Sequence, residues 1–155
     1  MSMEIEILSD FHLKSFDEWQ RSIDAIGFPL QLDSNIGVED IGGFIPARLG
    51  ETPTGFECYQ DNANEVVQSL GLSNLGRAWR FALGLRWKGD LNELQAAWMA
   101  AAAYARATNG VIFDYEEGKV YHPPEAIAQV QRIRRDVPHV EAMLREIITR
   151  FTPKK

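Results

Sequence analysis

The stretch DYEEGK, residues 114–119, places three carboxylates within four positions and follows them with a glycine. An EF-hand calcium loop needs oxygen ligands at alternate positions, a central glycine and a late glutamate. Gly118 and Lys119 stand at the fifth and sixth positions of this stretch, so the calcium-loop pattern is not met. A glycosidase needs two carboxylates that face each other across a cleft, and neighbouring residues of one turn cannot do that.

A tight hairpin accounts better for the same stretch. The flanking runs GVIFD and KVYHP have the composition of strands, and a glycine at position 118 fits a left-handed turn conformation. We therefore predict a structural turn that presents Glu116 and Glu117 outward, where a basic partner could contact them.

The cysteine and the histidines lack the neighbouring residues that a catalytic or zinc site requires. Cys58 is the single cysteine, and none of His12, His122 and His139 stands in a recognisable nucleophile motif. Zinc sites draw on Cys and His at short spacings, which the sequence does not contain. We predict no catalytic residue, no cofactor and no metal site, and hence no enzymatic activity.

Glycine-rich and basic stretches give no nucleotide or nucleic-acid signal. GVEDIGG is not followed by the Lys-Ser or Lys-Thr of a phosphate loop, and GLSNLGRAW leads into a strand rather than a helix. The basic residues Arg132, Arg134 and Arg135 are diluted by acidic neighbours along a predicted helix. We expect a solvated helix face there and no binding of nucleic acid.

The composition indicates a folded protein with an acidic surface. The 155 residues are 45% hydrophobic and 25% charged, with a formal net charge of −6. Such a surface disfavours nucleic acid and anionic membranes and attracts basic partners. A lone cysteine suits a reducing compartment, and the first residues lack the pattern of a signal peptide. We expect a cytoplasmic protein, either a monomer or a small homo-oligomer.

Hydrophobic periodicity predicts strands and helices in alternation. Strands are expected at 4–8, 28–32, 44–49, 55–60, 76–87, 110–114 and 119–123, and helices at 15–26, 64–70, 90–108 and from 127 onward. This order predicts an α+β fold with a mixed, mostly antiparallel sheet and helices mainly on one face. Because no linker or repeat is found, residues 1–155 are expected to form a single domain.

Two prolines add detail to this prediction. Pro46 predicts that its strand lies at an edge of the sheet, because proline cannot donate a ladder hydrogen bond. Pro138 interrupts a long helical stripe, so we favour two helices broken near Asp136, with one kinked helix as the alternative. The stripe consists of Ile127, Val130, Ile133, Val137, Val140, Leu144, Ile147 and Phe151.

Acidic residues recur in the predicted loops, some of them beside tyrosines. Aromatic anchors and complementary charge are common features of protein interfaces. We predict a partner-binding surface that contains Glu39, Asp40, Glu57, Tyr59, Asp61, Tyr115, Glu116 and Glu117.

Two stretches resemble segments of small bacterial proteins that are immunity partners of interbacterial toxins. The first, residues 27–60, contains GFPLQLD and GGFIPARLGETPTGFECYQ, and the second, residues 107–127, is ATNGVIFDYEEGKVYHPPEAI. The resemblance implies a small cytoplasmic protein without an active site that binds a toxin directly. It assigns no functional residue.

We therefore expect an immunity protein that neutralises a cognate basic toxin by direct contact, and a nuclease is one class of toxin that fits. An alternative is an enzyme or small-molecule-binding domain whose pocket is built from Trp79, Arg80, Arg86, Trp87 and His122. A secretion adaptor with an exposed apolar groove is a third class.

Overall fold

The structure of the protein is a computed structural model that describes residues 2–71 and 78–151, the side chain of Phe151 excepted. The elements follow the predicted alternation of strands and helices. In chain order they are β1 (Met3–Ser9), α1 (Phe16–Ile26), β2 (Leu30–Leu32), the short 3-10 helix η1 (Val38–Asp40), β3 (Gly42–Leu49), β4 (Thr52–Asp61), α2 (Ala63–Leu70), β5 (Phe81–Trp87), α3 (Leu91–Thr108), β6 (Val111–Asp114), β7 (Lys119–Tyr121) and α4 (Pro123–Phe151).

The described strands form one seven-stranded sheet in the order β2-β3-β4-β5-β1-β6-β7, and every neighbouring pair is antiparallel. The α+β prediction is confirmed. Strand β1 lies inside the sheet between β5 and β6, although it is the first strand of the chain. Its residue Glu6 is opposite Gly84 on one side and Phe113 on the other.

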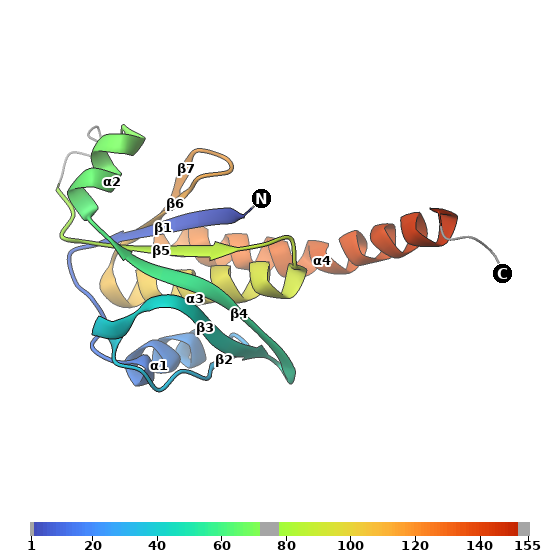
Figure 1. The fold of residues 1–155 in the computed structure, drawn as a ribbon, viewed down its shortest axis with the longest axis horizontal. Coiled ribbons are helices and arrows are strands. Elements are labelled where there is room, and N and C mark those ends of the chain that lie inside the picture. Colours follow the sequence, from blue (N-terminus) through green and yellow to red (C-terminus); the bar gives the residue numbers. More distant parts are fainter. Residues whose placement is uncertain (1, 72–77, 152–155) are drawn as a thin grey trace.

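Helix α3 covers one face of the sheet, and its alanines let neighbouring elements come close (Figure 1). Its buried positions include an unbroken run of alanines from Ala100 to Ala103. The Nε1 atom of Trp19 in α1 donates a hydrogen bond to the Ala100 carbonyl at 2.9 Å, and the Ser22 hydroxyl donates to the Ala103 carbonyl at 2.7 Å. Small side chains at this contact leave the backbone of α3 within reach of α1.

The predicted ends of α1 and α3 are confirmed, whereas α4 begins at Pro123, before the predicted residue 127. Strand β5 begins at Phe81, and residues 76–77 of its predicted range lie outside the described residues. The Ser15 hydroxyl accepts a hydrogen bond from the Glu18 amide at 3.1 Å, and the Asp90 carboxylate caps α3 in the same way. Helix α1 ends at Gly27 and α3 ends at Asn109, and both of these residues are in the left-handed conformation.

The prediction that Pro46 lies in an edge strand is wrong, because β2 pairs with the outer side of β3. Strand β2 is only three residues long, and its last residue, Leu32, is opposite Ala47. The Pro46 carbonyl points to the β2 side, where it accepts a hydrogen bond from the Asp33 amide at 2.9 Å. The amide hydrogen that proline lacks belongs to that same side, so the long β3–β4 ladder loses no bond.

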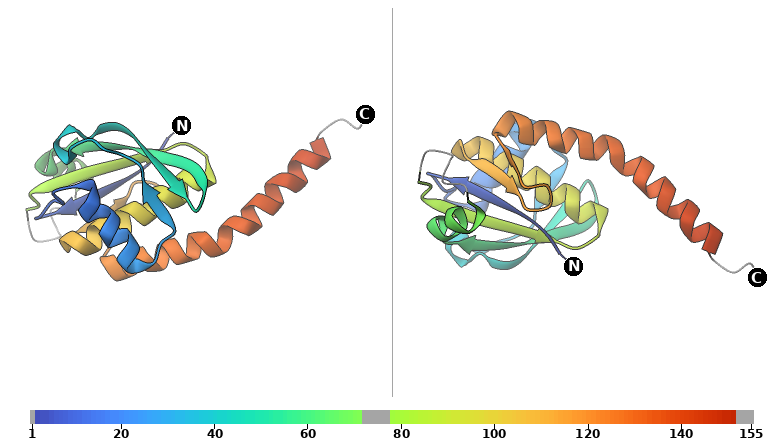
Figure 2. Two further views of the ribbon diagram at one scale, coloured as in Figure 1. Left: turned by 90° about the horizontal axis from the view of Figure 1, so that it is seen from below. Right: turned by 90° about the horizontal axis from the view of Figure 1, so that it is seen from above.

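The prediction of two helices broken near Asp136 is also wrong, because α4 is one helix with Pro138 inside it. Figure 2 shows that the axis of α4 bends along its length, as expected for a helix that contains a proline. Its first part packs on the body, with Val130 only 1% exposed. Its second part projects from the body, and Leu144 and Ile147 there are 48% and 47% exposed. The side chain of Phe151, the last residue of the predicted stripe, lies outside the described residues.

Helix α2 lies on the face of the sheet opposite α3. Its Val66 packs in a second apolar cluster with Leu8, Ala82 and Phe113, whose side chains point away from α3. Figure 1 shows α2 above one end of strands β1 and β5, so most of this face is not covered by a helix. None of the described helices has the length and apolar character of a membrane-crossing segment.

Candidate functional site

Alternation along β1 gives the two faces of the sheet opposite chemical characters. Ile5 and Ile7 point into the main core with α3, and Glu4 and Glu6 point to the other side. We use the name open face for the side of the sheet opposite α3. Beside the apolar residues near α2, it contains Glu57, Tyr59 and Asp61 from β4, Gly84 and Arg86 from β5, Glu4 and Glu6 from β1, and Tyr115 just after β6.

The antiparallel register arranges the open face in rows that run across the strands. Arg86 is opposite Glu57 on β4 and Glu4 on β1. In the next row, Gly84 is opposite Tyr59 and Glu6. Strand β5 therefore contributes a guanidinium to one row and no side chain to the next.

The missing side chain at Gly84 leaves the space in which carboxylates meet. A Cβ atom at this position would lie 2.7 Å from Oδ2 of Asp61 and 2.8 Å from Oε2 of Glu6. Glu4, Glu6 and Asp61 each place one carboxylate oxygen within 4.8 Å of the other two. We call these three residues the carboxylate cluster.

Glu6 is the most deeply buried member of the cluster, at 1% exposure. As long as Asp61 is ionised, Oε2 of Glu6 has no hydrogen-bond donor among the described residues. Burial, followed by a hydrogen bond to Asp61 and repulsion from Asp61 and Glu4, raises the pKa of Glu6 to about 9. Without a bound cation, Glu6 therefore holds a proton at neutral pH.

An arginine and two tyrosines surround the cluster. The Nε atom of Arg86 forms an ion pair with Oε1 of Glu4 at 3.2 Å, and its guanidinium lies 5.0 Å from the centre of the Tyr59 ring. The Tyr59 hydroxyl donates to Oε1 of Glu57 at 3.1 Å. The Tyr115 hydroxyl donates to Oε1 of Glu6 at 3.3 Å, and burial with nearby acidic groups raises the pKa of Tyr115.

A hollow of about 370 Å³ lies over the cluster, with α2 as one wall. Four of its lining residues carry a carboxyl group and one carries a guanidinium, so the hollow suits a positively charged group. We call it the acidic hollow. Its lining residues are Glu4, Glu6, Asp61, Asn62, Glu65, Val66, Ser69, Arg86 and Tyr115.

The structure brings half of the eight predicted partner-binding residues together on the open face, namely Glu57, Tyr59, Asp61 and Tyr115. Glu116 and Glu117 follow Tyr115 in the turn between β6 and β7. Glu39 and Asp40 lie in η1, next to the end of β4, where Gln60 donates a side-chain hydrogen bond to the Glu39 carbonyl at 3.2 Å. Glu39 lines a different cavity, which shares no lining residue with the acidic hollow.

The DYEEGK stretch forms the predicted turn. The Gly118 amide donates to the Asp114 carbonyl at 2.8 Å, and Gly118 is in the left-handed conformation with φ of 65°. The Asp114 carboxylate accepts from the Glu116 amide at 2.9 Å, which uses one of the three carboxylates inside the turn. Glu116 and Glu117 are exposed, as expected.

Glu4, Glu6 and Glu65, which line the acidic hollow, are not among the site residues predicted from the sequence. The available signal was the pair of glutamates at alternate positions of an apolar strand, because repeated acidic residues on one face of an inner strand need a polar site there. Residues at short spacings in the sequence do not form this cluster. Asp61 meets Glu6 only because β4 and β1 both pair with β5.

The residues proposed for a scattered enzyme pocket do not meet in one place. Trp79 and Arg80 line one cavity, Arg86 and Trp87 line another, and His122 lines neither. Cys58 is fully buried, and burial raises the pKa of its thiol, which disfavours a thiolate nucleophile.

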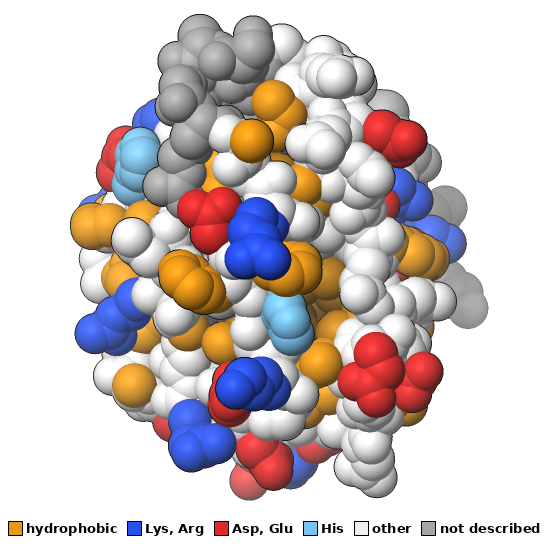
Figure 3. Space-filling model, turned by 90° about the vertical axis from the view of Figure 1, so that its left-hand side faces the viewer, with side chains coloured by type: hydrophobic (Ala, Val, Ile, Leu, Met, Phe, Trp, Pro, Cys, Tyr) orange, Lys and Arg blue, Asp and Glu red, His pale blue; other side chains and the backbone are white. Residues whose placement is uncertain are grey.

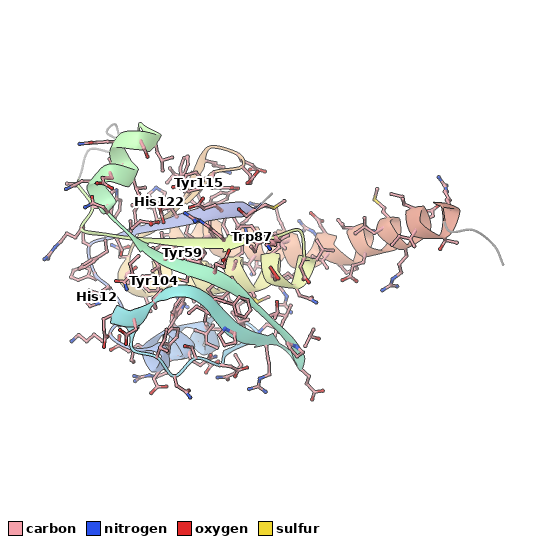
Figure 4. The ribbon with its side chains drawn as sticks, in the orientation of Figure 1. His12, Tyr59, Trp87, Tyr104, Tyr115 and His122 are labelled. Atoms are coloured by element: carbon pink, nitrogen blue, oxygen red, sulfur yellow. The ribbon has the colours of Figure 1, made fainter. Side chains whose placement is uncertain are left out.

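A more apolar cavity of about 270 Å³ lies at the end of the molecule that carries His12. In Figure 4, Tyr115 lies in the upper part of the molecule, whereas His12 and Tyr104 lie lower and to the left. Figure 3 views this end, where acidic and basic side chains are interspersed among hydrophobic ones. The cavity is lined by Ser9, His12, Leu13, Val38, Glu39, Ile41, Gln60, Phe81, Ala82, Leu83 and Tyr104.

Comparison of the chain with models of known protein families, with curated proteins and with solved structures gave no match. Functional inference therefore depends on the geometry and electrostatics of the open face.

Proposed function

We propose that the protein is an immunity protein that binds a basic toxin through the open face and neutralises it by direct contact. The observation that carries this proposal is the acidic hollow, in which four carboxyl groups surround a single guanidinium. A lysine or arginine of a partner would gain more from this environment than from bulk water, because charges interact strongly in a partly buried site.

The rim of the hollow supports the same proposal. Tyr115 is 37% exposed and lies between the hollow and the exposed carboxylates of Glu116 and Glu117. A partly exposed tyrosine offers a partner a rigid apolar surface with a polar tip, which is typical of interface anchors. The net charge of −6 would speed the encounter with a basic protein and make it sensitive to salt.

Affinity capture from a lysate of the source organism tests this function. The tagged protein is expected to retain one stoichiometric partner with a basic toxin domain, identified by mass spectrometry. A variant with Glu116→Lys and Glu117→Lys should lose that partner. A control with Asp17→Lys and Glu51→Lys carries the same charge change on exposed residues outside the open face and should retain it.

The two variants separate the function from the surface assigned to it. Equal loss in both variants would attribute binding to net charge alone, and equal retention would remove Glu116 and Glu117, at the rim of the open face, from the interface. Absence of any partner at low salt would contradict the immunity function itself.

The cavity beside His12 supports a second candidate, the binding of a small molecule. Its volume of about 270 Å³ is near the lower end of ligand pockets, and its lining combines an imidazole, a phenol and an amide with apolar side chains. Incubation with a metabolite extract should then raise the melting temperature of the protein and of His122→Ala, but not of His12→Ala. No shift in any of the three would contradict this candidate.

A further inference from the structure

Neighbouring side chains compensate the negative charge of the carboxylate cluster only in part. Three carboxylates converge within 4.8 Å, and the deepest of them, Glu6, is 1% exposed. Its Oε2 atom lies against Asp61, which is itself an acceptor, and no described residue donates to it. A buried carboxylate in this state needs either a proton or a cation.

The residues around the cluster hold the carboxylates in a converging arrangement. Arg86 forms an ion pair with Oε1 of Glu4, and the Tyr115 hydroxyl binds Oε1 of Glu6. The other oxygen of Glu6, Oε2, is thereby left facing Asp61 over Gly84. For Glu6, a supporting group thus fixes the outer oxygen and leaves the inner one free, as is typical of the surroundings of metal ligands. For Glu4, the oxygen nearest Gly84 is Oε1, which Arg86 also contacts.

Gly84 supplies a further condition for such a site. Any other residue would place its Cβ atom less than 3 Å from the oxygens of Asp61 and Glu6, in the space where they converge. Because residue 84 has no side chain, β5 leaves open the space in which these oxygens could bind one ion together.

We propose that Glu4, Glu6 and Asp61 bind a calcium ion. All three ligands are carboxylate oxygens, which hard cations prefer, and the three residues include no thiol or imidazole that would favour zinc or copper. Calcium–oxygen distances of about 2.3–2.6 Å allow ligands on opposite sides of the ion to be about 4.6–5.2 Å apart. The 4.8 Å limit on the cluster is compatible with that separation.

The acidic hollow can complete the coordination. Calcium takes about six to eight oxygen ligands, more than three carboxylates provide. The hollow of about 370 Å³ over the cluster has room for the water molecules that would supply the remaining ligands. This inference does not depend on the proposed immunity function, because it concerns the isolated protein.

Calorimetric titration of the chelator-treated, full-length protein with calcium chloride tests the proposal. One ion per chain is expected, with a dissociation constant on the order of 10⁻⁵ to 10⁻³ M and weaker binding of magnesium, which requires shorter bonds. Glu6→Gln and Asp61→Asn should each weaken calcium binding at least tenfold. Glu57→Gln removes a carboxylate from the same face but outside the cluster, and should bind calcium as the wild type does.

Proton release distinguishes this site from nonspecific attraction to an acidic surface. Carboxylates must be deprotonated to bind a metal ion, so titrations in buffers of different ionisation enthalpy should report proton release on calcium binding. The affinity should rise with pH. The charged or titratable groups that face Glu6 are Glu4, Asp61, Glu65, Arg86 and Tyr115.

Two results would overturn the proposal. One is the absence of binding at about 10 mM calcium and pH 8. The other is equal calcium binding by the wild type and by a folded Glu6→Gln variant. Neither result bears on partner capture, which separates this proposal from the immunity function.

Discussion

The two faces of the sheet come from the same strands and differ in almost every physical respect. On the α3 side, Ile5, Ile7 and Leu85 pack against a helix whose central residues are fully buried alanines. On the open face, the neighbouring positions are Glu4, Glu6 and Gly84, and the space between them is polar. One face gains free energy by excluding water, and the other loses free energy by holding charges together.

This difference shows which parts of the chain stabilise the fold and which parts form the site. Strand residues alternate between the two faces, so a change at one residue of β1 acts on stability and a change at the next acts on binding. Substitutions on the two faces should therefore have effects of different size and different pH dependence.

The largest effect is expected for Trp19→Ala on the covered side. Trp19 is 0% exposed, contacts the rings of Phe16, Phe56 and Tyr104, and binds the Ala100 carbonyl. Its truncation should lower the free energy of unfolding by about 3–5 kcal/mol. Urea unfolding measures this loss, with the 67% exposed Phe11 truncated to alanine as the control. A loss in Trp19→Ala no larger than that in the control would contradict the assignment of the core.

A smaller, pH-dependent effect of opposite sign is expected for Glu6→Gln in the presence of a chelator. The folded-state pKa of Glu6, about 9, lies above its ordinary value of 4.5. The folded protein therefore holds a proton that the unfolded chain releases, and stability falls as the pH rises from about 4.5 to 9. Glutamine does not titrate, so the Glu6→Gln variant should not lose this stability as the pH rises.

Thermal unfolding between pH 5 and pH 8 measures the effect. The wild type should lose about 2 kcal/mol more than Glu6→Gln over this range, less than the full pKa difference implies because the site can relax. Glu57→Gln, on the same face, should retain the wild-type dependence. Identical profiles for the wild type and Glu6→Gln would show that Glu6 does not hold the proton.

The covered face was largely predictable from the sequence because local rules determine it. Capping residues such as Ser15 and Asp90, a left-handed Gly27 and the alternation of β5 each act within a few residues, and the structure bears them out. The two errors arose where a neighbour in space decides the outcome. A short β2 covers the side of Pro46, and tertiary packing carries α4 through Pro138.

The carboxylate cluster could be predicted only in part, for the same reason. Alternating glutamates in β1 were visible, but their meeting with Asp61 depends on a strand order that places β5 between β4 and β1. The apolar stripe of α4 was also visible, whereas the sequence does not indicate that Val140, Leu144 and Ile147 remain exposed.

The substitutions Gly84→Ala and Gly110→Ala each add one methyl group, so they compare the polar and the backbone-lined environment directly. At Gly84 the new atom meets the ends of flexible side chains, Asp61 and Glu6, which can move aside. At Gly110 it would lie 2.5 Å from the Leu8 carbonyl oxygen and 3.0 Å from Cβ of Ser9, which cannot. We expect a loss of about 1–3 kcal/mol for Gly110→Ala and a change of less than about 1 kcal/mol for Gly84→Ala.

Calcium binding should show the reverse order for these two glycine variants. Gly84→Ala moves the converging oxygens apart and should abolish the calcium response in calorimetry, whereas Gly110→Ala should keep it in the folded protein. Calcium binding by Gly84→Ala at wild-type affinity would mean that the space over Gly84 is not where the ligands meet.

The smallest effect on stability is expected at the rim of the open face, for Glu116→Lys combined with Glu117→Lys. Both side chains are exposed, and the turn itself is held by Asp114 and Gly118, which the variant leaves in place. The free energy of unfolding should change by no more than about 0.5 kcal/mol, as for most surface substitutions. Urea unfolding checks this value beside partner capture. A variant that loses the partner with unchanged stability would locate part of the binding surface at the rim of the open face, whereas loss of both would attribute the effect to a damaged hairpin.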